Sequence, residues 1–434
     1  MYHYIEEVTD MEPTKTKTQK FHYGFIILIG CCFITGVAVA IPINCSGLFT
    51  AHVCKELNIG QGAFNLAITI MFLTMALLLP FGGKIIAKFD IRVISTLAAI
   101  AVGGAFFLNS FYTSVFPFYI SGFLMGLGGV FNLFLTGPTL MNRWFKLRNG
   151  FYLGIAMAFT GIGAIVFGSV GGALIDAFGW RSTYRILAII TLITCVPVSL
   201  FLFRSFPKDK GLEPYGAEKA AELNAQQSAE KGKETGVSAK VAFRSLPFYL
   251  VCLFTLCGSF GTSGINQYIP PFVVLGGYSA TLSGVVLSCT SLGNTGGKII
   301  LGYINDKSNQ IAVIIGTLCG ISGLGLLLLF AHMGTWVIFT GATLFGVALA
   351  FPVVQTPLFV NKLFGRREYP QIYSWIMPLS SFGSAFSFTL YGVIKDVTGS
   401  YDNVFKLALC LLCVACIAGT CALITGKKLK HTTE

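Results

Sequence analysis

The sequence contains few charged residues. Only 11% of its 434 residues are Asp, Glu, Lys or Arg, whereas 54% are hydrophobic. Soluble domains carry about 25% charged residues, so this composition excludes an ordinary soluble protein. Apolar runs of roughly 20 residues recur along the chain, and each is long enough to cross a bilayer core of about 30 Å. We therefore expect an integral membrane protein whose main surroundings are the lipid bilayer.

Signals of several other protein classes are also absent. Residues 1–20 show neither an apolar core nor a small-residue cleavage site, so we expect no signal peptide. The 13 cysteines lie mainly in apolar runs, where cysteine acts as a small hydrophobe, so we expect no disulfides and no metal site. No catalytic set of His, Cys and Asp is recognisable. We expect no enzymatic activity and no cofactor.

The apolar runs predict twelve transmembrane helices. Backbone polar groups must be satisfied inside lipid, and a helix satisfies them within one segment. Charged and Gly/Pro-rich breaks divide the runs at 23–48, 62–83, 93–112, 116–141, 150–175, 184–204, 246–274, 282–303, 311–331, 335–361, 370–394 and 404–426.

The net charge of +12 follows the predicted topology. Of the 30 Lys and Arg residues, all but Lys55, Arg181, Arg185, Lys395 and Lys406 fall on one side of the predicted spans. Basic residues are enriched in cytoplasmic loops. We therefore place both termini in the cytoplasm and expect a multi-pass protein of a cell membrane, with a bacterial inner membrane favoured. The basic charge is a topology signal, and we expect no nucleic-acid partner.

An internal repeat divides the chain into two halves. The segment NRWFKLR at 142–148 matches NKLFGRR at 361–367, and Pro138 and Pro357 keep the same spacing. Asp176 and Asp396 are further landmarks at nearly the same offset. We expect two parallel six-helix repeats. The predicted units are a cytoplasmic tail at 1–22, a bundle at 23–204, a partly helical cytoplasmic linker at 205–245, a second bundle at 246–426, and a tail at 427–434.

Residues 142–163, NRWFKLRNGFYLGIAMAFTGIG, carry the strongest family signal, together with GWRSTY at 179–184 and DVTGSY at 396–401. With these motifs the chain resembles the major facilitator superfamily over nearly its full length. Within it, the chain is similar to monocarboxylate porters and oxalate:formate antiporters. The resemblance implies an all-α membrane protein with twelve transmembrane helices in two pseudo-symmetric six-helix bundles, and a transport function.

The sequence departs from the family pattern at several positions. The loop after the second span keeps Gly83 and Arg92, but the usual Asp and Gly positions hold Ala87 and Asp90. The resemblance aligns the Asp and Arg of proton-coupled monocarboxylate porters with Asn294 and Lys298. A lysine that dicarboxylate exchangers carry on the eleventh span aligns with Ile376.

Lys298 is the most informative single residue. Its context, GNTGGKI, lacks the pattern of a nucleotide-binding loop, because Leu292 and Ile299 occupy positions that require Gly and Ser or Thr. One alternative is that the side chain extends to the nearby membrane interface. The favoured alternative is that it faces a central cavity, because charges inside a membrane usually face water or a partner. A cation with no acid nearby in its span is suited to bind an anionic substrate.

No Asp or Glu lies centrally in a predicted span, so a proton-coupled mechanism would protonate Lys298 or the substrate itself. We predict that the substrate site contains Lys298, Asn294, Gln267, Gln355, Tyr268, Trp375 and Asn132. For each of the polar residues alone, hydrogen bonding between helices is an equal alternative. We predict gating or topology roles for Arg143, Arg148, Arg92, Asp306, Lys362 and Arg367.

These features together predict a secondary transporter of small organic anions, with monocarboxylates favoured. It would work by alternating access, as a proton symporter or an anion exchanger, and as a monomer. One alternative is an exporter of neutral solutes or drugs with the same fold. Another is a membrane sensor that binds its ligand without moving it.

Overall fold

The computed structural model describes residues 22–146, 149–217, 237–365 and 368–426. These residues are almost entirely helical and form no strand, apart from an isolated bridge between Phe145 and Tyr215. The protein is therefore an all-α membrane protein, as the apolar runs predicted. Arg148 and Arg367, two of the predicted gating residues, lie outside the described residues.

The first group of helices is built from residues 23–202. Its elements are α1 (Tyr23–Phe33), a π-helical turn (Ile34–Val39), α2 (Ala40–Asn44), α3 (Gly47–Leu57), α4 (Gln61–Lys88), α5 (Ile91–Asn109), α6 (Phe116–Gly129), a second π-helical turn (Val130–Leu135), α7 (Thr136–Trp144), α8 (Asn149–Pro197) and a final π-helical turn (Val198–Leu202).

The second group is built from residues 239–426. Its elements are α10 (Ala239–Phe243), α11 (Leu246–Leu275), α12 (Ala280–Lys307), α13 (Asn309–Phe330), α14 (Thr335–Phe364), α15 (Tyr369–Thr398) and α16 (Asp402–Gly426). Short 3-10 turns lie at Pro207–Lys210 and Ala331–Met333.

Several predicted boundaries differ from the structure: α4, for example, ends at Lys88 and not at 83, and two further differences concern α8 and α12. The loop expected between 175 and 184 is a single break, because α8 continues on both sides of Gly179, whose backbone is left-handed (φ 76°). Glycine adopts this conformation without the steric cost of a Cβ atom. In addition, α12 extends four residues beyond the predicted end at 303, to Lys307. Lys298 therefore lies nine residues, or about 13 Å, before the end of its helix.

Nine helical stretches of the described residues are long and apolar enough to cross a membrane. One of them, Gly150–Leu202, contains 53 residues and includes the break at Gly179. The helices α12 and α15 have 28 and 30 residues and a more polar composition, so they are absent from that set. If the broken stretch is counted as two spans and these two helices are added, the total is twelve; the predicted count of twelve spans agrees with this sum but stays a prediction.

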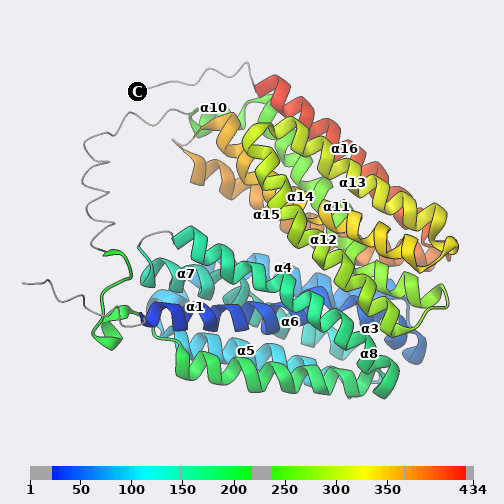
Figure 1. Cartoon of the computed structure of the whole chain (residues 1–434), viewed down its shortest axis with the longest axis horizontal. Helices are drawn as coiled ribbons and strands as arrows, with labels where there is room; N and C mark the ends of the chain where they lie inside the picture. Colours follow the sequence, from blue (N-terminus) through cyan, green and yellow to red (C-terminus); the bar gives the residue numbers. More distant parts are fainter. Residues whose placement is uncertain (1–21, 147–148, 218–236, 366–367, 427–434) are drawn as a thin grey trace, which may run out of the picture.

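The two groups of helices contact each other mainly along three pairs of elements, α8 with α12, α4 with α15, and α3 with α11, with a smaller contact between α3 and α12. Figure 1 shows the groups close together near α3 and α12 and diverging toward α7 and α10. We call the end with residues 57–61 and 276–280 the far end. The opposite end, with residues 205–217 and 237–245, is the linker end.

The glycines of α8 show where the two groups of helices separate. Along α8, a Cβ atom on Gly172, Gly168 or Gly161 would meet atoms of α12, whereas one on Gly154 or Gly150 would meet nothing within 4 Å. The contact therefore extends from the far end to about the middle of the helices. Beyond that point the two groups diverge, so this conformation is closed at the far end and open at the linker end.

The described parts of segment 205–245 are attached to the linker end at equivalent places. The Tyr215 amide donates to the Trp144 carbonyl oxygen (2.8 Å), and the Val237 amide donates to the Phe364 carbonyl oxygen (2.8 Å). Each attachment follows the helix that carries one copy of the sequence repeat. The predicted helical part of this segment beyond residue 217 falls largely outside the described residues.

Candidate functional site

A cavity of about 170 Å³ lies between the two groups of helices; we call it the central cavity. Its walls come from α2, α4, α11, α12, α14 and α15, so both groups contribute. The lining residues are Ile43, Asn44, Phe72, Ser263, Asn266, Gln267, Asn294, Lys298, Leu349 and Phe388. The volume is sufficient for several water molecules or a small organic molecule.

Lys298 is the charged residue among the described residues of this lining, which include no Asp or Glu. The two salt bridges found among the described residues, Arg92–Asp90 and Arg181–Glu56, do not involve it. Its side chain is half-buried on α12 and lines the cavity. This placement favours the predicted cavity position over extension to the interface. A cation in such surroundings attracts an anion from solution, because no lining carboxylate neutralises it.

Asn294 and Gln267, two other predicted site residues, also line the central cavity. Asn294 lies one helical turn before Lys298, so both side chains are on the same face of α12. Gln267 comes from α11, and its Nε2 donates to the Ile43 carbonyl oxygen of α2 (2.7 Å). Gln267 therefore forms part of the cavity wall and also joins the two groups of helices.

The other predicted site residues lie away from the lining. Tyr268 is fully buried and its hydroxyl accepts from Asn65 Nδ2 (2.9 Å) and donates to the Phe388 carbonyl oxygen. Trp375 is 66% exposed, and its ring centroid lies 6.2 Å from that of Phe243.

Two further predicted residues are buried within one group of helices each. Asn132 Oδ1 accepts from Ser95 Oγ (3.3 Å), while its Nδ2 finds no hydrogen-bond partner in the part of the chain that the structure describes. Gln355 on α14 is 0% exposed, and neither of its amide atoms has a hydrogen-bond partner among the described residues. In this conformation both side chains are enclosed by packing and do not reach the central cavity.

The sequence-based site set omitted several lining residues. Asn44 ends α2, and a lone amide after the apolar run AVAIPI was the available signal for it. Phe72 and Phe388 face each other across the two groups, with ring centroids 5.1 Å apart. Phenylalanines are abundant in this chain, so composition alone gave no means of singling out these two.

The predicted gating residues at the linker end make local contacts. Arg143 donates to the Ser205 carbonyl oxygen (3.3 Å) and stacks on Phe206, and Lys362 Nζ donates to Asn309 Oδ1 (2.7 Å). These contacts remain within one group of helices and its adjoining segment. Asp306 belongs to α12, but its side chain is not among those that the structure describes.

Arg92 and Asp90 form a local ion pair where α5 begins. Arg92 Nη2 lies 2.7 Å from Asp90 Oδ2, and Asp90 Oδ1 accepts from the Arg92 amide and from Ser205 Oγ. Partial burial acts to raise the pKa of Asp90, but these hydrogen bonds and the Arg92 charge outweigh it and lower the pKa. Asp90 thus caps α5 and ties residue 205 to it.

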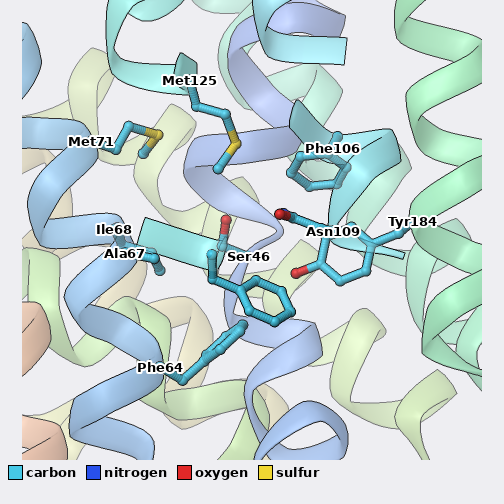
Figure 2. A pocket seen from close by; sticks show the side chains of 10 residues that line it. Ser46, Phe64, Ala67, Ile68, Met71, Phe106, Asn109, Met125 and Tyr184 are labelled. Atoms are coloured by element: carbon cyan, nitrogen blue, oxygen red, sulfur yellow. The ribbon is translucent and has the colours of Figure 1, made fainter. Parts of the chain in front are cut away.

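A second cavity of about 20 Å³ lies inside the first group of helices. Figure 2 shows Met71, Met125 and Phe106 around it, with oxygen atoms contributed by Ser46, Asn109 and Tyr184. Its volume admits about one water molecule, since one probe sphere occupies about 10–15 Å³. It is too small to hold an organic substrate, so the central cavity is the candidate site.

The described residues include no group of three or more His, Cys, Asp or Glu side chains arranged to hold a metal ion. The described lining of the central cavity offers one cation, four amide groups, the Ser263 hydroxyl and two aromatic rings for binding a ligand.

Known proteins with similar sequences are transporters. The chain is 23% identical over 397 residues to monocarboxylate transporter 12 of Xenopus laevis, covering 89% of this chain and 85% of that protein. It is 27% identical over 214 residues to monocarboxylate transporter 4 of Rattus norvegicus, covering 49% and 45% respectively.

Solved structures with the same fold are also transporters. The crystal structure of the nucleoside transporter NupG superimposes with a TM-score of 0.71 over 94% of this chain and 100% of that one, at 11% identity. The sequence profile of the Major Facilitator Superfamily matches residues 25–388. This match covers most of the chain, and with the helical architecture it shows that the protein is a multi-pass membrane transporter belonging to the major facilitator superfamily.

Proposed function

We propose that the protein is a secondary active transporter of small organic anions, with monocarboxylates favoured, and that Lys298 binds the anionic group of the substrate. The observation that carries this proposal is the lysine in the lining of the central cavity, where the described lining residues include no other charged side chain. A carboxylate bound there would form a charge-assisted hydrogen bond with the ammonium group. The similarity to monocarboxylate transporters supports the same substrate class.

We propose that the linker end faces the cytoplasm, because most basic residues gather there. The conformation described here is then inward-facing, with the central cavity closed on its outer side. Transport would alternate this state with one closed at the linker end. Substrate binding biases the exchange only through its different affinity for the two states. We further propose that the protein works as a monomer in an inner membrane.

Two modes of coupling fit a cavity whose described lining residues include no carboxylate. In proton symport, the proton travels on Lys298 or on the substrate. In anion exchange, the transporter changes back to its other conformation only when a second anion is bound to Lys298. Uptake into vesicles separates them, since an inward proton gradient drives symport into empty vesicles, whereas exchange requires an anion inside.

A neutral polar solute is the second candidate substrate. The lining contains four amide side chains, Asn44, Asn266, Gln267 and Asn294, which suit hydroxyl groups as well as carboxylates. In that case the positive charge of Lys298 would be dispensable for binding.

The test is a thermal-shift screen of the purified protein against monocarboxylates, dicarboxylates and neutral solutes. A ligand present at 100 times its Kd stabilises the folded state by about 2.7 kcal/mol. We expect a monocarboxylate to raise the melting temperature of the wild type and of Lys298→Arg, but not of Lys298→Gln. The matched control is Lys307→Gln, which removes a lysine from the end of the same helix, where it stacks on Tyr303.

The outcomes separate the candidates. A carboxylate shift lost in Lys298→Gln and kept in Lys307→Gln supports the proposal. A shift of equal size in Lys298→Gln, or shifts from neutral solutes alone, would contradict organic-anion binding by Lys298.

A further inference from the structure

The closed far end is held by two aspartates that each bind the first turn of a helix in the other group. Asp396, near the end of α15, accepts from the amides of Gln61 (3.0 Å) and Gly62 (2.8 Å) at the start of α4. The first amides of a helix have no partner within it. The capping residue of α4 is Gly60, which has no side chain to bind them. Asp396 supplies the missing cap from the opposite group.

Asp176 repeats this arrangement in the other direction. It lies in α8 and accepts from the amides of Ala280 (3.0 Å) and Thr281 (2.6 Å) at the start of α12. The Thr281 hydroxyl adds a third hydrogen bond of 2.6 Å. Ser279, the capping residue of α12, binds the amide of Leu282 with its own side chain. Asp176 therefore binds the two amides that the local cap leaves free.

The contacts of Asp176 and Asp396 lie at equivalent positions of the internal repeat. The capped positions Gln61 and Ala280 are separated by the same 219 residues as the landmarks Pro138 and Pro357, and the two aspartates by one residue more. In both contacts, each carboxylate oxygen accepts from a different amide. A carboxylate can accept at both oxygens, whereas an Asn side chain has only one acceptor atom. The geometry thus requires Asp, and the negative charge also favours the positive end of the helix dipole.

We propose that Asp176 and Asp396 are the two latches of the outer gate, and that both must release their helix for the transporter to open at the far end. Each latch joins opposite groups of helices, so opening breaks both sets of hydrogen bonds together. The proposal rests on the alternating-access part of the proposed function and is independent of the substrate. Asp176 and Asp396 are positioning residues, since neither lines the central cavity.

The surface next to one latch is suited to reversible opening. Below Asp396, three side chains spaced by four residues on α4 bond to the second group: Gln61 Oε1 with the Tyr401 hydroxyl (2.8 Å), Asn65 Nδ2 with the Tyr268 hydroxyl (2.9 Å) and Thr69 Oγ1 with Thr389 Oγ1 (2.8 Å). Water entering an open gate can replace such bonds at a small net cost. Charged caps at the rim would therefore contribute much of the preference for the closed state.

The experiment is hydrogen exchange measured by mass spectrometry on the full-length protein in lipid nanodiscs, without substrate. The variants are Asp176→Ala, Asp396→Ala and the double variant. We expect each single variant to raise exchange about 2- to 30-fold at both capped segments, 57–66 and 276–286, because the gate opens as a unit. Exchange at the linker-end segments 150–158 and 369–377 should fall, since that end closes when the far end opens.

Two further variants distinguish opening of the gate from the local loss of a helix cap. In Gly60→Ser, a new side chain caps α4 locally, and its Cβ atom would lie 2.5 Å from Asp396 Oδ2, so the aspartate is displaced without loss of helix capping. We expect it to open the far end as Asp396→Ala does. Asp402→Asn is the control, because Asp402 is exposed at the start of α16 and has no role in either latch.

A rise confined to the segment next to each mutation, with no change at the linker end, would reduce the aspartates to local helix caps and overturn the proposal. The same conclusion would follow if Gly60→Ser left exchange unchanged. Failure of every organic anion in the thermal-shift screen would leave these exchange results unaffected, so the two proposals fail separately.

Discussion

The two cross-group contacts at the far end share their latches but differ in how their helices meet. Between α8 and α12 the backbones themselves touch, because Gly168, Gly172 and Gly284 lie at the contact. Between α4 and its partners α15 and α11, the backbones also touch beside the latch, at Gly62 and Gly392, but polar side chains including Asn65, Thr69 and Tyr268 continue the contact from there. The repeat has therefore kept the caps and the glycine contacts beside them, at Gly172 and Gly392, and changed the surfaces farther from the far end.

This difference shows that the two groups of helices can contact each other through two kinds of surface within one fold. Backbone contact through glycine leaves no space that a side chain could fill, so α8 and α12 can only separate or slide as rigid surfaces. Hydrogen-bonded side chains can instead exchange their partners for water. We expect the α8–α12 contact to respond to added volume and the α4 contact to respond to lost hydrogen bonds.

The largest effect is expected from added volume at the glycine contact. In Gly284→Val, the new Cβ atom would overlap the Gly168 carbonyl oxygen, so the far end could no longer close. Overpacking of this kind costs about 1–3 kcal/mol. We expect a loss of at least about tenfold in transport rate, measured in proteoliposomes.

Gly104→Val is the matched control for this prediction, because a Cβ atom on Gly104 meets nothing within 4 Å. Both variants place a β-branched residue inside a helix, with the same local cost. Equal transport losses in the two variants would show that helix propensity, and not the cross-group contact, explains the effect.

A moderate effect is expected from Tyr268→Phe at the polar contact. The change leaves Asn65 Nδ2 and the Phe388 carbonyl oxygen without their bond to the Tyr268 hydroxyl. An unsatisfied buried polar group costs about 1–3 kcal/mol. We expect the melting temperature without ligand to fall by roughly 2–6 °C, relative to Tyr249→Phe at an exposed position of the same helix.

The same variant tests the earlier expectation that Tyr268 binds substrate. If Tyr268 acts only in the contact, a carboxylate should still raise the melting temperature of Tyr268→Phe by as much as it does in the wild type. A lost ligand shift with unchanged basal stability would instead place Tyr268 in the substrate site.

The smallest effect is expected from Ser169→Ala in the glycine contact. Ser169 Oγ lies 2.9 Å from Ser288 Oγ, but Ser288 also bonds to the carbonyl oxygens of Ile165 and Gly284. Because Ser288 keeps partners, we expect stability to change by less than about 0.5 kcal/mol. A drop in melting temperature as large as that of Tyr268→Phe would show that hydrogen bonds matter equally in both contacts, and would remove the contrast between them.

The helices were largely predictable from the sequence, and their ends were less so. The run before Gly179 and the run after it were both recognised, but the break between them was predicted as a loop of several residues. A single left-handed glycine replaces that loop. The local sequence favours neither a helical nor an irregular conformation for the residues that flank such a break. Packing against the neighbouring helices decides which conformation they adopt.

The candidate site was predictable in part. Lys298 stood out because a charge in an apolar run is rare, and Asn294 and Gln267 accompany it in the central cavity. Gln355 and Asn132 had the same sequence signal, an amide in a span, yet both lie inside one group of helices. A local pattern reports that a polar residue needs surroundings other than lipid, but it does not distinguish a cavity from a helix contact.

The sequence by itself determined that this chain crosses the membrane repeatedly, that its two halves repeat, and that its spans carry one conspicuous lysine. These properties follow from local composition, since each span must satisfy its backbone and bury apolar side chains in lipid. Only the tertiary structure showed that Asp176 and Asp396, seen in the sequence as repeat landmarks, cap helices of the opposite half. Their partners lie more than 100 residues away, and no local periodicity encodes which helix ends will meet.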